Sequence, residues 1–223
     1  MNLLDFEKPI AELEGKLADM KHLANDSDES VKGAIQALEK KITELKKETF
    51  DNLTGWQRVQ LSRHPSRPLT SDFVANIFDD FQELKGDRAY KDDPAILCGF
   101  GTIDGHKVMV MGHRKGKTLK ERLECNFGCA HPEGYRKALL KMQLAEKFNL
   151  PIISFINTPG AYPGIEAEER GQSHAIAENI REMTGLKVPI ITCTIGEGGS
   201  GGALGIGVGD RYLIMENAYY SVI

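Results

Sequence analysis

Long hydrophobic runs are absent from this sequence, in which no stretch approaches the roughly 20 apolar residues that a membrane-spanning helix needs. The opening MNLLDFEKPIAELEGK also lacks the basic segment and the apolar segment of a secretory signal peptide. An excess of basic residues is missing too, because the net charge is −4, so charge gives no argument for binding nucleic acid or a membrane surface. We therefore expect a cytoplasmic protein that binds neither nucleic acid nor membrane.

Cysteine is scarce, with 4 residues in the chain. No two of them form a Cys-x-x-Cys pair. Cys125 and Cys129 could lie one turn apart on a helix, but no second pair of ligands accompanies them. Thiols of cytoplasmic proteins normally stay reduced. We expect unpaired, mostly structural cysteines and no metal ion bound by this chain.

The chain begins with a pattern of two amphipathic helices. Apolar residues recur at steps of three and four over residues 3–48, and the polar stretch 25–28 interrupts them. The two apolar stripes comprise Ile10, Leu13, Leu17 and Met20, then Val31, Ile35, Leu38, Ile42 and Leu45. The pattern predicts an N-terminal helical hairpin, residues 1–50, followed by a larger domain, residues 51–223. A partner-binding role for the hairpin stays open, because two helices alone bury little surface.

Helical and strand patterns alternate in the larger domain. Strands are predicted at residues 95–103, 107–112, 151–156, 188–195 and 212–215, and helices at residues 73–84, 133–149 and 166–184. An Asp104-Gly105 turn joins the first two strands as a hairpin. The short apolar runs at 151–156 and 188–195 are typical of buried strands. Such alternation favours an α/β domain with a largely parallel sheet.

Two glycine-rich loops each follow a predicted buried strand, at residues 157–164 and 196–203. Open α/β sheets bind ligands at the carboxyl ends of their strands, and glycine lets backbone N–H groups approach a ligand closely. If Gly201 and Gly202 open a helix, their N–H groups lack partners within it, and the helix dipole adds partial positive charge there. The pattern therefore indicates an oxyanion hole built from main-chain donors.

Three other interpretations of these motifs are weaker. Gly196, Gly198 and Gly201 satisfy G-x-G-x-x-G, but the glycine-dotted segment after them is a poor crossover helix for a dinucleotide fold. Ser200 lies in a G-x-S-x-G-like string, yet no histidine follows His174, as that type of triad requires. The basic loop at residues 112–117 could meet a phosphate or a carboxylate, or be a solvated turn.

Seven strings in this order resemble the alpha-subunit family of acetyl-CoA carboxylase carboxyltransferases. They lie at residues 4–10, 86–88, 126–128, 132–139, 158–164, 167–173 and 196–204. The resemblance spans the whole chain, and its last three strings are highly specific. It implies an α/β, crotonase-like ββα spiral domain, of the ClpP/crotonase type, with an N-terminal helical hairpin extension.

The resemblance also implies a division of labour. The alpha subunit would supply the carboxybiotin half of the site, and a zinc-bearing beta subunit would supply most of the acetyl-CoA half in an α2β2 heterotetramer. Biotin would arrive on a separate carboxyl carrier protein, after carboxylation by biotin carboxylase. By motif matching, the N–H groups of Gly201 and Gly202 form the biotin oxyanion hole. The residues expected to line the same pocket are Gly160, Ala161, Tyr162, Gly164, Gly198 and Gly199.

One departure from the family and two rival functions accompany this prediction. Family members continue beyond residue 223, so the C-terminal part of the domain is expected to be missing, which would leave residues 212–223 uncovered and the protein poorly soluble. One rival is another crotonase-like acyl-CoA enzyme with a carboxylate beside the oxyanion hole, taken from Glu166, Glu168, Glu169 or Glu197. The other is a truncated, inactive chain that acts only as an interaction partner.

Overall fold

The computed structural model describes residues 3–23 and 29–222, and the chain divides into two compact units between Gln60 and Leu61. The first unit is built on a helical hairpin. A short 3-10 helix, η1 (Asp5–Glu7), leads into α1 (Lys8–Leu23), which packs against α2 (Glu29–Asp51) before α3 (Gly55–Ser62) begins. The hairpin is thus confirmed for the described residues, whereas the predicted break at residues 25–28 lies outside them. The domain division predicted at residue 50 stays a prediction.

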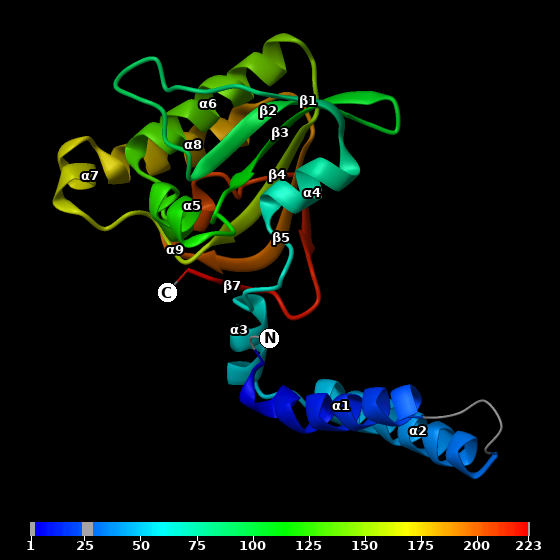
Figure 1. The fold of residues 1–223 in the computed structure, drawn as a ribbon. Helices are drawn as coiled ribbons and strands as arrows, with labels where there is room; N and C mark the ends of the chain where they lie inside the picture. The colour runs from blue at the N-terminus through cyan, green and yellow to red at the C-terminus, as the bar shows by residue number, and fades with distance from the viewer. Residues whose placement is uncertain (1–2, 24–28, 223) are drawn as a thin grey trace. The chain divides into compact units, whose positions relative to one another are not determined.

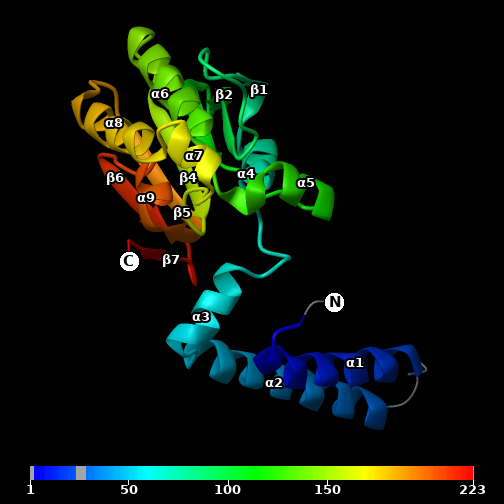
Figure 2. The same ribbon diagram turned by 90° about the vertical axis from the view of Figure 1, so that its left-hand side faces the viewer.

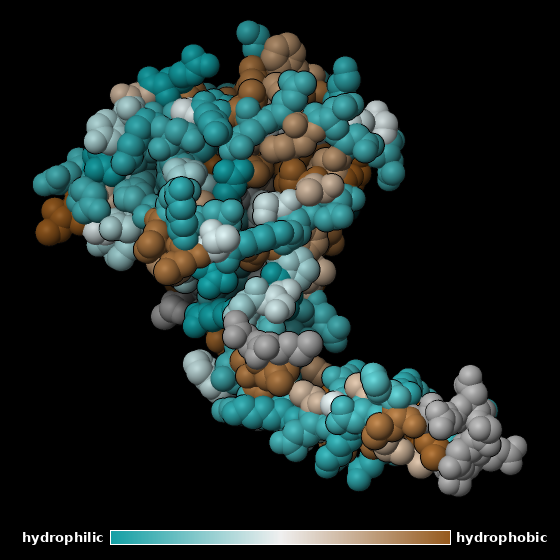
Figure 3. Space-filling view, in the orientation of Figure 1, coloured by the Kyte–Doolittle hydropathy of each residue, from teal (hydrophilic) through white to brown (hydrophobic). Residues whose placement is uncertain are grey.

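Few apolar contacts hold the hairpin together. Ile10 and Ile42 are buried, and the rings of Phe6 and Phe50 meet edge to face with centroids 6.3 Å apart. Two ion pairs also join α1 to α2, Lys21 to Glu39 at 2.7 Å and Lys46 to Glu14 at 2.6 Å. Hydrophilic residues cover much of the hairpin face seen in Figure 3. The apolar stripes of α1 and α2 therefore pack against each other and bury a narrow apolar contact.

A seven-stranded mixed sheet forms the centre of the second unit (Figure 1). Its strands are β1 (Asp79–Glu83), β2 (Ile96–Ile103), β3 (His106–His113), β4 (Ile152–Thr158), β5 (Ile190–Gly199), β6 (Arg211–Ile214) and β7 (Tyr219–Ser221). The order is β1-β2-β3-β4-β5-β6, with β7 also paired to β5. The β1–β2 and β2–β3 pairs are antiparallel, and the other pairs are parallel. The predicted strands and the largely parallel sheet are confirmed.

Two hydrophobic clusters cover the two faces of the sheet. The helices are α4 (Thr70–Ile77), α5 (Leu119–Glu124), η2 (Asn126–Gly128), α6 (Pro132–Lys147), α7 (Ile165–Glu169), α8 (Gln172–Gly185) and α9 (Ser200–Leu204). On one face, α6 and α8 lie side by side and pack on Met109 and Met111 of β3 (Figure 2). On the other face, α4 packs on Val108 and Val110 of the same strand. The alternation along β3 follows from the two-residue period of a strand.

The helix predicted at residues 73–84 is wrong beyond Ile77. The chain turns to extended backbone at Phe78, and β1 then pairs with β2 at the edge of the sheet. Phe78 and Phe81 both pack in the cluster on the α4 face, so apolar spacing that suits a helix is met here by a short helix followed by a strand. The helix predicted at residues 166–184 is divided into α7 and α8, because Gly171 takes the left-handed conformation, with φ 81°.

The last strands leave apolar side chains at the surface. Tyr212, Leu213 and Ile214 of β6 are 66%, 57% and 59% exposed, in line with the expectation that this segment is uncovered. Ile223, the last residue of that expectation, lies outside the described residues. Within the described ranges no helix has both the length and the apolar character needed to cross a membrane.

Candidate active site

The two glycine-rich loops touch each other. The first continues from the end of β4, whereas the loop predicted at residues 196–203 is wrong in form, because residues 196–199 end β5 and residues 200–203 lie in α9. These residues, called the second loop below, lie at the same edge of the sheet as the first loop, since β4 and β5 are adjacent and parallel. A Cβ added to Gly202 would lie 2.3 Å from the amide nitrogen of Ala161 and 2.4 Å from the carbonyl carbon of Gly160. A Cβ added to Gly199 would lie 2.1 Å from the carbonyl oxygen of Pro159. Only glycine permits this approach, and it brings four of the predicted site residues together.

β5 runs directly into α9, a helix of five residues that begins at Ser200. Gly201 and Gly202 lie in its first turn, as the sequence predicts, and N–H groups in a first turn have no partner within the helix. Two buried side chains form hydrogen bonds with the carbonyl oxygen of Gly202, in the place that a further turn of the helix would otherwise take. The Tyr135 hydroxyl donates to it from α6 at 3.2 Å, and His113 Nε2 contacts it from the end of β3 at 3.2 Å.

The hydrogen bonds of His113 define its tautomer. Its Nδ1 accepts from the backbone N–H of Asn157 at 3.3 Å, so Nε2 carries the proton and donates to Gly202. The ring is fully buried, and this burial lowers the pKa of His113 to about 4. His113 is therefore a neutral donor at physiological pH, and with Tyr135 it fixes the peptide that follows the proposed N–H donors.

The remaining residues of the predicted site have other neighbours. The ring of Tyr162 stacks on that of His131, with centroids 4.1 Å apart, and its N–H donates to Ala130 at 3.0 Å. Gly164 packs against the same tyrosine ring, where a Cβ would lie 2.3 Å from it. Gly198 leaves space for the ring of Tyr220, 2.4 Å from where its Cβ would be. Contacts of Tyr162 with His131 and Ala130 thus hold the second half of the first loop in place. Gly198 has a different role, because its lack of a side chain lets Tyr220 of β7 pack against it.

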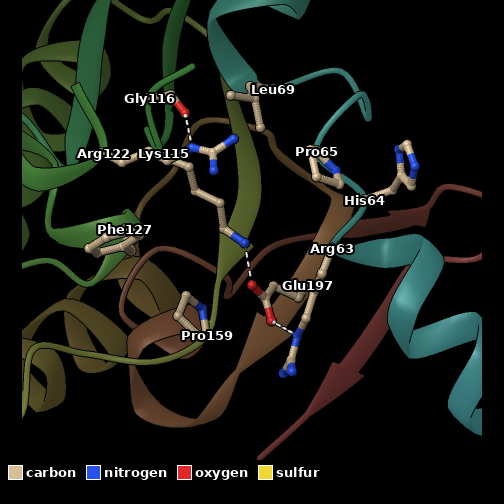
Figure 4. Close-up of a pocket in the computed structure, with 10 residues that line it drawn as sticks. All are labelled: Arg63, His64, Pro65, Leu69, Lys115, Gly116, Arg122, Phe127, Pro159 and Glu197. Atoms are coloured by element: carbon tan, nitrogen blue, oxygen red, sulfur yellow. Dashed lines mark hydrogen bonds and ion pairs between the residues drawn. The ribbon is translucent and has the colours of Figure 1, made fainter. Parts of the chain in front are cut away.

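An ion cluster around the buried Glu197 lies beside the loops (Figure 4). Glu197 is 5% exposed at its side chain, and its Oε1 accepts from the Lys115 ammonium. Its Oε2 accepts from Arg63 Nε at 2.6 Å and from the Tyr219 hydroxyl at 3.0 Å. Burial raises the pKa of Glu197, but the charges of Lys115 and Arg63 and their hydrogen bonds outweigh it and hold the pKa below its usual value. Glu197 is therefore an ionised carboxylate with both oxygens occupied.

The same cluster forms one wall of a cavity of about 210 Å³. The remaining walls comprise His64, Pro65, Leu69, Gly116, Arg122, Phe127 and Pro159. Phe127 is 49% exposed and has φ 55°, a left-handed conformation that costs a residue with a side chain roughly 1–2 kcal/mol. Asn126 before it (φ 46°) and Gly128 after it (φ 89°) are left-handed as well. A Cβ on Gly128 would lie 2.8 Å from Lys115 Cγ, so this glycine makes room for the lysine stem.

Sequence reasoning found part of this cavity. It singled out the basic loop that contains Lys115, and it named Glu197 only as an available carboxylate. It missed Arg63 and Arg122. Arg63 reaches Glu197 across 134 positions of sequence, and Arg122 lies on the short helix α5, which has no buried residue and on which an arginine is ordinary. The local sequence signal for this cavity was the string at residues 126–128, which includes Phe127 and precedes α6.

The cysteines are unpaired. Burial raises the pKa of Cys125 to about 11, which keeps its thiol protonated. In the part of the chain that the structure describes, no group of three or more His, Cys, Asp or Glu side chains is placed to hold a metal ion.

Comparison with known proteins connects this geometry to a family. A family model described as acetyl co-enzyme A carboxylase carboxyltransferase-like matches residues 3–223. The acetyl-coenzyme A carboxylase carboxyl transferase subunit alpha of Syntrophotalea carbinolica is 56% identical over 220 residues, a match that covers 99% of this chain and 69% of that protein. The subunit of the same name from Pasteurella multocida is 57% identical over 221 residues, covering 99% and 70%.

Solved structures agree at the level of fold. The beta subunit of P. aeruginosa geranyl-CoA carboxylase matches with a TM-score of 0.58 and 25% identity, over 72% of this chain and 29% of that one. A transcarboxylase 12S structure with hydrolysed methylmalonyl-coenzyme A bound matches with a TM-score of 0.60 and 20% identity, over 74% of this chain and 32% of that one. These proteins have the crotonase-like fold, so the predicted crotonase-like α/β domain is confirmed.

Proposed function

This chain belongs to the acetyl-CoA carboxylase carboxyltransferase family, whose carboxyl transfer serves fatty acid synthesis, and from that premise we propose that it forms the carboxybiotin half of the site at which acetyl-CoA becomes malonyl-CoA. The contact between the two glycine loops carries the proposal. It gathers main-chain N–H groups at one edge of the sheet, next to a one-turn helix whose first donors lack helical partners.

The loops leave room for a ligand beside two of their glycines. Apart from its neighbours along the chain, no atom of the described residues lies within 4 Å of the Cβ position of Gly160, and that of Gly201 meets, outside its own helix, the Ile176 side chain at 3.7 Å. Gly199 and Gly202, by contrast, are closed off by the first loop. The open positions therefore offer access to the backbone, while the closed ones hold it in place. This arrangement fits a flat ring whose oxygen must approach main-chain donors.

Bound carboxybiotin would provide the carboxyl group for acetyl-CoA and, after losing it, a ureido anion basic enough to accept the proton of acetyl-CoA. The N–H groups of Gly201 and Gly202 would donate to the ureido oxygen, where negative charge develops during transfer. Partial positive charge at the start of α9 favours the same oxygen. Removing one donor from such an oxyanion hole typically costs on the order of 3 kcal/mol in the transition state.

The glutamates do not favour a hydratase or isomerase with a carboxylate base. A general base needs a pKa near the working pH and a free oxygen near the substrate. Glu197 has a lowered pKa and two occupied oxygens. Glu166, Glu168 and Glu169 are exposed on α7, and the hydrogen bonds of Glu166 lower its pKa. Carboxyl transfer needs no such side chain.

The proposal extends to partners. We place beside this chain a zinc-bearing beta subunit, which would contribute most of the acetyl-CoA half of an α2β2 assembly, and a biotin carboxyl carrier protein that is charged by biotin carboxylase. Membership of the alpha-subunit family supports these partners. The four unpaired cysteines support a cytoplasmic site of action, where thiols remain reduced.

The decisive experiment measures malonyl-CoA decarboxylation coupled to biocytin, with the beta subunit added or withheld. We expect turnover only when the beta subunit and biocytin are both present. Gly201→Pro deletes an N–H and should abolish turnover, whereas Gly185→Ala, at an exposed glycine far along α8 with open space at its Cβ position, should leave turnover unchanged. Normal turnover by the proline variant in an assembled complex would exclude the oxyanion-hole assignment, and biotin-independent activity would favour another crotonase-like enzyme.

A further inference from the structure

Arg122 holds a charge inside the cavity that no carboxylate of the described residues balances. Its Nε donates to the carbonyl oxygen of Gly116 over a long 3.4 Å. The four N–H donors on its two terminal nitrogens make no hydrogen bond within the described part of the chain. The side chain is partly buried, and Figure 4 shows its guanidinium group pointing into the cavity. A guanidinium fork placed in this way matches the geometry of a carboxylate or phosphate.

A second cation faces the same space with donors to spare. The Lys115 ammonium has three donors, and only its bond to Glu197 is recorded. Its side chain is 17% exposed, so it stays inside the protein rather than in bulk water. The cavity wall carries three cationic side chains, Arg63, Lys115 and Arg122, against the single carboxylate of Glu197. Since Glu197 balances only one of these charges, the cavity remains positive.

Phe127 adds a flat apolar surface. Its ring lines the cavity opposite Leu69 and Pro65 (Figure 4), and its backbone is left-handed, with φ 55°. Strained backbone of this kind gathers at ligand-binding sites. An aromatic face beside a guanidinium suits a molecule that carries a flat ring next to an anionic group.

We propose that this cavity is an oxyanion site, in which Arg122 and Lys115 bind a carboxylate or phosphate group of a ligand while its flat part rests on Phe127. The site is distinct from the main-chain donors of Gly201 and Gly202, which would meet a developing charge on a ring oxygen. It stands on the contacts of the cavity and is independent of the carboxybiotin assignment.

Calorimetric titration of the full chain tests the site with three probes: inorganic phosphate, malonate and adenosine 3′,5′-bisphosphate. We expect saturable binding that weakens on the order of 10- to 100-fold in Arg122→Gln, the range for losing hydrogen bonds to a charged group. The matched control is Arg181→Gln, since Arg181 is exposed on α8 and pairs with Glu182. Circular dichroism should show Arg122→Gln folded, because the wild-type side chain makes only one weak hydrogen bond.

The probes separate the sources of the anion. Tighter binding of the bisphosphate than of malonate identifies a phosphate ester, such as the nucleotide part of an acyl-CoA, and the reverse order identifies a carboxylate. Phe127→Ala should remove any advantage of the bisphosphate over inorganic phosphate and leave phosphate binding unchanged. The proposal fails if no probe binds at millimolar concentration, or if Arg122→Gln binds as tightly as Arg181→Gln does.

Discussion

Gly202→Ala tests whether the contact between the two loops sets the geometry of the site. The new methyl group would lie 2.3 Å from the Ala161 nitrogen and 2.4 Å from the Gly160 carbonyl carbon, and both are backbone atoms. Ordinary contact begins at 3.4 Å, so the loops must separate by about 1 Å. A misplacement of about 1 Å can lower a rate on the order of 100-fold, and overpacking of this kind destabilises a fold by roughly 1–3 kcal/mol.

The assay is malonyl-CoA decarboxylation with biocytin and the beta subunit, alongside urea unfolding of each variant. Gly185→Ala is the matched control, because Gly185 is an exposed glycine at the end of α8 and the added methyl group would meet open space. We expect a fall of about 100-fold in kcat for Gly202→Ala and little change for Gly185→Ala. If a folded Gly202→Ala protein turned over as fast as the control, close approach of the loops would not be what positions the donors.

Three further predictions concern the groups around the loops. Tyr135→Phe removes one donor from the Gly202 carbonyl but leaves His113 bound, so urea unfolding should show a loss of about 1 kcal/mol, and kcat should fall more than KM changes. Burial lowers the pKa of His113 from 6.5 to about 4 in the folded protein. Between these two pH values the histidine of the unfolded chain is therefore protonated more than that of the folded protein. The stability that His113 contributes is therefore complete above pH 6.5 and is lost as pH falls towards 4, and His113→Asn should flatten that part of an unfolding-versus-pH curve. Glu197→Gln leaves Lys115 and Arg63 without their carboxylate and should lower the midpoint temperature of thermal unfolding. The variant that remains folded should keep its decarboxylation rate within about 10-fold of the unsubstituted protein. Loss of a general base would instead lower that rate by about 100- to 10,000-fold.

Regular elements of the second unit followed from the sequence because their physics is local. The buried strands β4 and β5 are short apolar runs between turn residues, and α6 has a clear helical period, so each pattern has one structural solution. The same reasoning gave a wrong prediction for the second half of residues 73–84. Phe78 and Phe81 suit a helix by spacing, but pairing with β2 at the sheet edge decides their conformation. Edge pairing is a tertiary contact, and local periodicity does not contain it.

The candidate site was predictable only where glycine marks it. Close backbone approach demands glycine, so the two loops were visible in the sequence, and the structure joins them through Gly199 and Gly202. The ion cluster was not visible, because Arg63, Lys115 and Glu197 come from three distant segments and each residue type is common on surfaces. His113 and Tyr135 were hidden for the same reason. Their role depends on one carbonyl oxygen that only the folded chain brings to them.

The one-turn helix α9 has a consequence for the dynamics of the site. Five residues are too few to form a helix on their own, so α9 persists because β3 and α6 hold its Gly202 carbonyl from inside the core. Its amide protons should therefore exchange with solvent only through openings that also loosen those two elements, which belong to the most stable part of the fold. The N–H donors are oriented when the protein folds rather than when a ligand arrives.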